Sequence, residues 1–275
     1  MRKPYLTALS NVVRDGTQTI SNFRGLADFI KDNKLWEGVL KYTWLSKFLI
    51  VVGLVGSFSF IHFVYNYWSD SQTAIQINTA GFTSALGGFF SEGYDLFVLG
   101  GLKYLILILM EVVIFHFARR TLEVKTGETI DTSLKVFIEA QIRMIKVVFY
   151  SWLMETIVTF IVVKVAFSIL GLHSLDTIVT MLIQCYFLGF AVIDNYNEIY
   201  KMTIKQSFRY TMQYGTVAFL IGFVVYLIML IPLAGTLMGP LLGAVVGTIT
   251  MYELCLLYTS PSPRDLSTSR MPSSA

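Results

Sequence analysis

Charged residues are scarce in this chain. Only 14% of its 275 residues are charged, against about 25% in soluble proteins. Three histidines and two cysteines leave little material for a metal centre, and no disulfide framework can be argued in either direction. The net charge of +3 is too small to indicate a nucleic-acid partner. What the chain has in excess is apolar surface, with 55% hydrophobic residues and a mean hydropathy of +0.63. This composition argues against a water-soluble globule.

Apolar runs long enough to cross a bilayer occur four times. A transmembrane helix needs about 20 predominantly apolar residues. The predicted spans are residues 47–68, 96–118, 147–170 and 175–193. Lipid admits only helices and closed barrels, and barrel-like alternation is absent. The sequence therefore predicts an all-α, polytopic integral membrane protein.

A fifth apolar block is different in character. Residues 210–252 contain no charge and are interrupted only around Pro232 and at Gly239-Pro240. Two interpretations stay open: a pair of short spanning helices, or a helical hairpin that enters the bilayer only partway. We expect a C-terminal hairpin of one of these kinds.

Segments rich in lysine and arginine alternate along the chain with segments that contain neither. Residues 1–47 hold eight, residues 119–146 hold six and residues 194–213 hold three, whereas the intervening loops hold none. Because cytoplasmic loops are enriched in these residues, the N-terminus is predicted to be cytoplasmic.

Two stretches of these basic segments have helical apolar spacing. Residues 1–46 are expected to form a cytoplasmic or interfacial amphipathic segment, in which residues 17–46 predict either an interfacial helix or a helix packed on the cytoplasmic loops. Residues 134–146 predict a helix that leads into the third span. The membrane domain is expected to cover residues 47–254.

Five ionisable residues lie inside the second and third predicted spans: Lys103, Glu111, His116, Glu155 and Lys164. His116 adjoins Arg119 and Arg120 and is expected to lie at the interface. Counted from the cytoplasmic edges, the two glutamates lie about eight residues deep and the two lysines about sixteen. This predicts an inner layer of carboxylates and an outer layer of ammonium groups. The two lysines of the outer layer would hold a small anion, and the glutamates would complete a polar pathway. The alternative is that the lysines extend outward to the interface and the glutamates reach water.

Signs of enzymatic chemistry are missing. The sequence offers no catalytic residues, no metal ligands at the required spacing and no cofactor motif, so we expect neither an enzyme nor a cofactor. Gly235, Gly239, Gly243 and Gly247 recur every four residues, which predicts close helix packing. The alternative is that helix ends near the proline break direct their dipoles at an ion.

The last 21 residues have a separate origin in our interpretation. Residues 255–275 are rich in Ser and Pro, as a disordered tail would be. They also resemble the translation of a transposase-type sequencing adapter, so we expect a non-native end and a native protein that continues beyond Leu254.

A motif in the C-terminal third carries a family resemblance. Asp194-Asn195-Tyr196 precedes a basic helix, and Pro232 and Gly239-Pro240 follow in the uncharged block. This arrangement resembles the etoposide-induced-2.4 family, whose bacterial branch contains CysZ-type sulfate permeases. The resemblance implies an oligomeric helical protein of the bacterial inner membrane, with partly inserted hairpins and sulfate uptake as its activity.

The first functional hypothesis is a membrane permease for a small anion, with sulfate as the candidate substrate. Family permeases carry a Pro-Gly-Leu-Arg-like sulfate contact before the first membrane helix, whereas the matching region here keeps only Gly38 and Lys41. Those two residues, with Lys103 and Lys164, are the predicted substrate contacts. The expected partners are the lipid bilayer, a small inorganic anion and further copies of the chain. The alternative is a non-transporting membrane scaffold that recruits proteins through its cytoplasmic helices.

Overall fold

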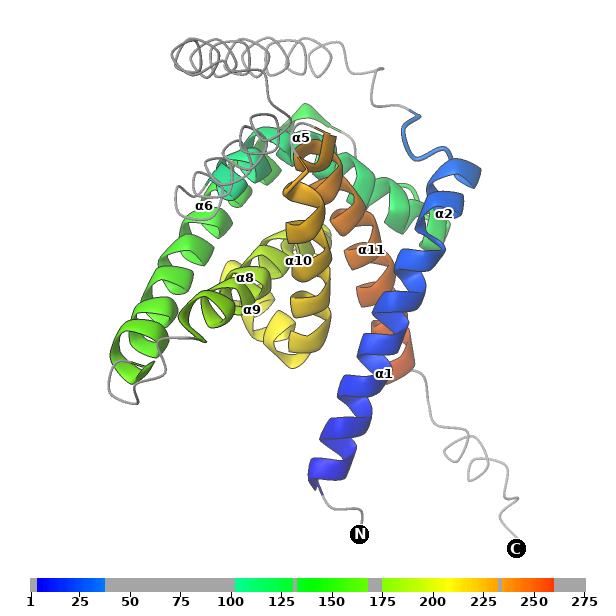
Figure 1. Cartoon of the computed structure of the whole chain (residues 1–275). Helices are drawn as coiled ribbons and strands as arrows, with labels where there is room; N and C mark the ends of the chain where they lie inside the picture. The colour runs from blue at the N-terminus through cyan, green and yellow to red at the C-terminus, as the bar shows by residue number, and fades with distance from the viewer. Residues whose placement is uncertain (1–3, 38–101, 131–132, 168–174, 232–233, 260–275) are drawn as a thin grey trace, which may run out of the picture.

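Helices account for every regular element that the structure describes. The structure is a computed structural model, and it describes residues 4–37, 102–130, 133–167, 175–231 and 234–259. Within these ranges there is no strand, in agreement with the predicted all-α class. The elements in Figure 1 are α1 (Pro4–Arg24), α2 (Leu26–Asp32), α5 (Leu102–Thr126), α6 (Leu134–Thr159), the π-helix η2 (Phe160–Phe167), α8 (Asp176–Ile199), α9 (Ile204–Gln213), α10 (Gly215–Met229) and α11 (Ala234–Thr259).

Three described helices are long and apolar enough to cross a membrane. They are Lys135–Val163, Asp176–Ile199 and Gly235–Leu256. A fourth candidate is α9 with α10, which are bent by 96° where they meet. The predicted third and fourth spans therefore coincide with membrane-length helices. The predicted first span lies outside the described residues, and only part of the second, as α5, lies within them.

Helix α6 and η2 expose many large apolar side chains. These side chains are more than one third exposed, and they include Ile138, Ile142, Ile145, Phe149, Trp152, Leu153, Ile157, Phe160, Ile161 and Val165. Exposed apolar surface of this extent on a soluble protein would promote association. It is compatible with a membrane location, where lipid would cover it.

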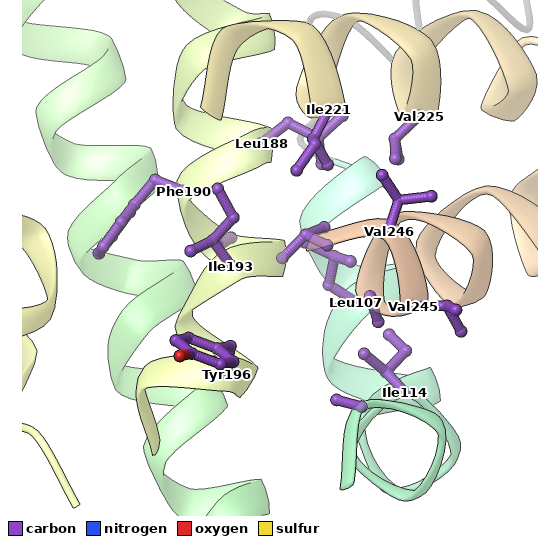
Figure 2. Close-up of a cluster of buried hydrophobic side chains, with 14 of the residues drawn as sticks. Leu107, Ile114, Leu188, Phe190, Ile193, Tyr196, Ile221, Val225, Val245 and Val246 are labelled. Atoms are coloured by element: carbon purple, nitrogen blue, oxygen red, sulfur yellow. The ribbon is translucent and has the colours of Figure 1, made fainter. Parts of the chain in front are cut away.

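The core lies where α8 is surrounded by other helices. Helix α8 contacts α10, α6, α11 and α5, while α1 packs against α10 and α11 on the far side from α6 (Figure 1). Figure 2 shows Leu188 and Ile193 of α8 pointing toward Ile221 of α10 and Val246 of α11. All four side chains are no more than 1% exposed. The apolar faces of these helices thus form one continuous core.

Glycine sets the separation of α8 and α10. A Cβ atom on Gly189 would lie 1.8 Å from the carbonyl oxygen of Ala218, and one on Gly222 would lie 1.7 Å from that of Cys185. Both distances are far below contact, so these two positions accept no side chain. The two helices approach each other backbone to backbone.

Part of the predicted glycine ladder packs in the same way. A Cβ on Gly235 would lie 1.9 Å from the carbonyl oxygen of Ile228, whereas at Gly247 the nearest atom would be 3.6 Å away. The expected break at Gly239-Pro240 is wrong, because α11 starts at Ala234 and continues through Pro240. Proline removes one intrahelical hydrogen bond, and the burial of α11 against α5, α8 and α10 outweighs that loss. The only other predicted break, around Pro232, lies outside the described residues.

The N-terminal segment differs from the predicted single helix over residues 17–46. Helix α1 begins at Pro4, and Gly25 separates it from the short α2. Three side chains converge on the Glu253 carboxylate of α11: Gln18 and Asn22 of α1, at 2.6 and 3.0 Å, and Lys125 of α5, at 2.8 Å. The polar face of α1 is therefore attached to α11 rather than fully solvated.

Candidate functional site

The interface between α5, α6 and α8 contains an unusual number of ionisable side chains. Lys103 and Glu111 come from α5, Arg143 and Glu155 from α6, and Asp194 from α8. All but Arg143 are buried. Ionisable groups inside membrane helices are expensive, and by default they suggest function. We call this set the charged interface.

Lys103 and Glu155 form an ion pair at one end of the charged interface. The Lys103 Nζ atom lies 2.9 Å from Glu155 Oε1, and the Tyr104 hydroxyl donates a hydrogen bond of 2.5 Å to Glu155 Oε2. Lys103 is 1% exposed and Glu155 8% exposed. The charge of Lys103 is therefore neutralised by a carboxylate, and neither side chain reaches open water.

The predicted layers of carboxylates and ammonium groups are wrong for this pair. Glu155 was expected about eight residues deep and Lys103 about sixteen, so that Glu155 would lie beside Glu111. Helix α6 starts at Leu134, in agreement with the predicted helix over residues 134–146. Its register along α5 brings Glu155 to Lys103 instead, a difference of about eight residues, or roughly 12 Å.

Arg143 links α6 to α8 and to the turn after α8 at the other end of the charged interface. Its Nε and Nη2 atoms donate to Asp194 Oδ2 and Oδ1 at 2.8 and 2.9 Å, a two-pronged contact of the strong type. Its Nη1 donates to the carbonyl oxygen of Met202 in the turn between α8 and α9. Glu198 lies one turn beyond Asp194, with its Oε2 atom 3.7 Å from Arg143 Nε.

The turn between α8 and α9 is shaped to present that carbonyl group. Lys201 takes a left-handed conformation with φ of 56°, and the next residue begins the approach to α9. Thr203 then caps α9 in a capping box with Gln206. This local structure places the Met202 carbonyl oxygen against Arg143.

Asp194 also accepts a hydrogen bond from α9. The Ser207 hydroxyl donates to Asp194 Oδ1, and the Asn197 side-chain amide donates to Ser207 Oγ at 2.9 Å. Asp194 is 2% exposed, and Asn197 and Ser207 are fully buried. The buried carboxylate is therefore satisfied by a guanidinium group and a hydroxyl group, as burial requires.

A pocket adjoins Arg143. Its volume is about 390 Å³, and it lies where α6, α8 and the start of α9 meet. It is lined by Glu139, Ile142, Arg143, Lys146, Glu198, Thr203 and Ile204. The two cations that line the pocket, Arg143 and Lys146, lie three residues apart on α6 and hence on one face of the helix.

Glu111 lies deeper, on the α5 side of the Arg143 group. It is fully buried, and neither carboxylate oxygen accepts a hydrogen bond from any residue that the structure describes. Arg143, Asp194 and Glu198 are the charged groups that act on it electrostatically. Arg143 thus lines the pocket and also acts electrostatically on a carboxyl group in the interior.

Several predicted site residues lie beyond what the structure describes. Gly38 and Lys41 fall in the undescribed range 38–101, and Pro232 is undescribed as well. Lys164 belongs to η2, but its side chain is outside the description. The predicted lysine pair is therefore represented by Lys103 alone.

Of the Asp194-Asn195-Tyr196 motif that carries the family resemblance, one residue belongs to the site and two belong to the core. Asp194 binds Arg143, whereas Tyr196 is buried and Asn195 donates to the carbonyl oxygen of Val192 within its own helix. Sequence reasoning missed Arg143, because it was counted among the loop cations. Arg143 lies within the predicted helix over residues 134–146, and this position was the available sign that it could face another helix.

Comparison with known proteins finds no matching family, no matching curated protein and no matching solved structure. Across the described residues, no group of three or more His, Cys, Asp or Glu side chains is arranged to hold a metal ion. The site is therefore interpreted from its own geometry.

Proposed function

We propose that this chain is a bacterial inner-membrane permease for a small anion, with sulfate as the candidate substrate. The observation that carries the proposal is the position of Arg143. Its guanidinium group lines the pocket and acts electrostatically on the buried Glu111. An anion that enters the pocket would meet this cation at the boundary of the charged interface.

Arg143 keeps capacity for a ligand despite its protein contacts. A guanidinium group has five N–H donors, of which about three are used by Asp194 and Met202. Lys146 adds a second cation to the pocket and makes no ion pair within the described ranges. Guanidinium and ammonium groups together suit an oxyanion such as sulfate.

The proposed topology has four spanning helices and a C-terminal hairpin, with the N-terminus in the cytoplasm. Helix α10 has 15 residues and is about 22 Å long, shorter than the hydrocarbon core of about 30 Å. Together with the 96° bend before it, this length favours a partly inserted α10 that turns back as α11. We propose that copies of the chain assemble into a homo-oligomer.

Flux measurements with the full chain in liposomes test the permease. We expect labelled sulfate to enter faster than in protein-free liposomes. Lys146→Gln should slow uptake several-fold, because it removes a pocket cation. The matched control is Lys31→Gln, which removes the same charge from an exposed position on α2 outside the pocket. Uptake no faster than through protein-free liposomes would refute the permease.

A second candidate is a membrane scaffold that recruits partners through its N-terminal helices. The observation that favours it is the exposure of Val12, Val13 and Ile20 on α1, each near one half. If neutral replacements of Lys103 and Lys164 preserve function while deletion of residues 17–46 abolishes it, the scaffold is the better interpretation.

A further inference from the structure

Glu111 differs from its charged neighbours in having no ion-pair or hydrogen-bond partner among the described residues. Lys103 pairs with Glu155, and Arg143 pairs with Asp194. Glu111 is 0% exposed, and both of its oxygens are without a hydrogen-bond donor among the residues described. An acceptor-only carboxylate in such a place has lost its hydration without replacement.

The surroundings of Glu111 disfavour a negative charge. Helices α6, α8 and α11 pack against α5. Arg143 is the cation that faces Glu111 from α6, and Asp194 and Glu198 face it from α8. The charged residue of α11 is Glu253, which is occupied by Lys125 near the end of α5. The Glu111 carboxyl group therefore has two acidic neighbours, Asp194 and Glu198, and one cationic neighbour, Arg143, which is already paired with Asp194.

A protonated carboxyl group resolves this conflict. Protonation removes the charge that burial penalises, and it removes the repulsion by the two acids. The neutral group still has an O–H donor for a later water molecule or anion. Ionisation would require water or a new cation to reach the interface.

We infer that Glu111 is a proton-binding site of the membrane domain, which holds a proton in the closed arrangement described here and releases it when the interface opens. The link to transport rests on the proposed permease function. With Glu111 neutral, an anion at Arg143 meets one negative charge fewer in the interior. With Glu111 ionised, the same anion is repelled, so proton binding and anion entry favour each other.

Infrared difference spectroscopy tests the proton site without any transport. The full chain in liposomes at pH 7 should show the carbonyl stretch of a protonated carboxylic acid. Glu111→Gln, a neutral replacement of nearly the same shape, should remove that contribution. Glu253→Gln is the matched control and should retain it, since Glu253 is ion-paired.

Glu111→Asp gives a second test of the same assignment. It retains a carboxyl group on a shorter side chain and should shift the carbonyl band rather than abolish it. An unchanged band in both Glu111 variants would show that Glu111 is ionised and would overturn the inference.

Proton movement tests the link to transport. Liposomes that contain a pH-sensitive dye should acidify when sulfate is added outside, and Glu111→Gln should reduce this acidification at least tenfold. Sulfate uptake by Glu111→Gln should remain measurable but should lose its dependence on pH. Wild-type pH dependence in Glu111→Gln would overturn the coupling. A Glu111 carbonyl band in a protein without sulfate uptake would support the proton site and overturn the permease.

Discussion

Replacement of Gly222 by alanine tests the closest helix contact of the fold. The new Cβ atom would lie 1.7 Å from the carbonyl oxygen of Cys185 and 2.7 Å from the amide nitrogen of Gly189. Both are backbone atoms of α8, so no side-chain rotation relieves the overlap. To restore ordinary contact, α10 must move away from α8 by roughly 1.5 to 2 Å, which forfeits much of the dispersion energy across the interface.

The expected magnitude follows from two opposing effects. Overpacking in a core usually costs about 1–3 kcal/mol, and a clash with rigid backbone belongs at the upper end. Alanine recovers up to about 1 kcal/mol through its higher helix propensity. Gly222→Ala should therefore lower the free energy of unfolding by about 2 kcal/mol.

Gly247→Ala is the matched control. It lies in the neighbouring helix α11, where its Cβ atom would meet nothing closer than 3.6 Å. It should be neutral or should stabilise the protein by up to about 1 kcal/mol. The assay is unfolding of the purified protein in mixed micelles with increasing SDS, followed by circular dichroism. Equal stability of the two variants would refute the close α8–α10 contact.

Three further variants probe the polar contacts, with the same unfolding assay except where stated. Lys103→Met should destabilise the protein by about 3–5 kcal/mol, because it leaves Glu155 buried without its cation; a loss below 1 kcal/mol would contradict the buried pair. Asp194→Asn should cost about 2–3 kcal/mol, because Arg143 loses a charged acceptor; wild-type stability would argue against this contact. Glu253→Ala should increase trypsin cleavage within α1, because the hydrogen bonds of Gln18 and Asn22 to the Glu253 carboxylate of α11 are lost; an unchanged cleavage pattern would contradict the docking of α1.

Periodicity and composition were sufficient to predict the helical class, but not the axial register of the helices. Apolar runs identified the helices that correspond to α6, α8 and α11, since a membrane-length apolar stretch is strongly specified by its composition. The register of α6 along α5 depends on side-chain packing between the two helices, which composition does not specify. The pairing of Glu155 with Lys103 differs from the expected depths by about eight residues, or roughly 12 Å.

Helix boundaries and side-chain partners also could not be predicted from the sequence. Pro240 predicted a break, yet tertiary contacts keep α11 continuous through it. Arg143 was assigned to a cytoplasmic loop because a cation near the end of an apolar run is usually solvated. Its partner Asp194 is 51 residues away, and no local pattern indicates a contact at that separation.

The motif behind the family resemblance has a sufficient structural explanation in this fold. Asp194 holds Arg143 and Ser207, and through them it joins α6, α8 and α9. A scaffold that only needed this helix arrangement would retain the motif as readily as a permease would. The motif alone therefore does not distinguish the two functions.

Lys103 and Glu155 offer a sharper distinction. Replacing a buried ion pair by apolar residues of similar volume is often neutral or stabilising, by about 1–4 kcal/mol. A chain under selection for stability alone has no need of this pair, which lies between α5 and α6 with both side chains withdrawn from water. The double variant Lys103→Met/Glu155→Met should therefore retain most of its stability, in contrast to Lys103→Met alone. If it also loses anion uptake, the pair serves transport, whereas undiminished uptake by a stable double variant would leave the pair without a role in the permease.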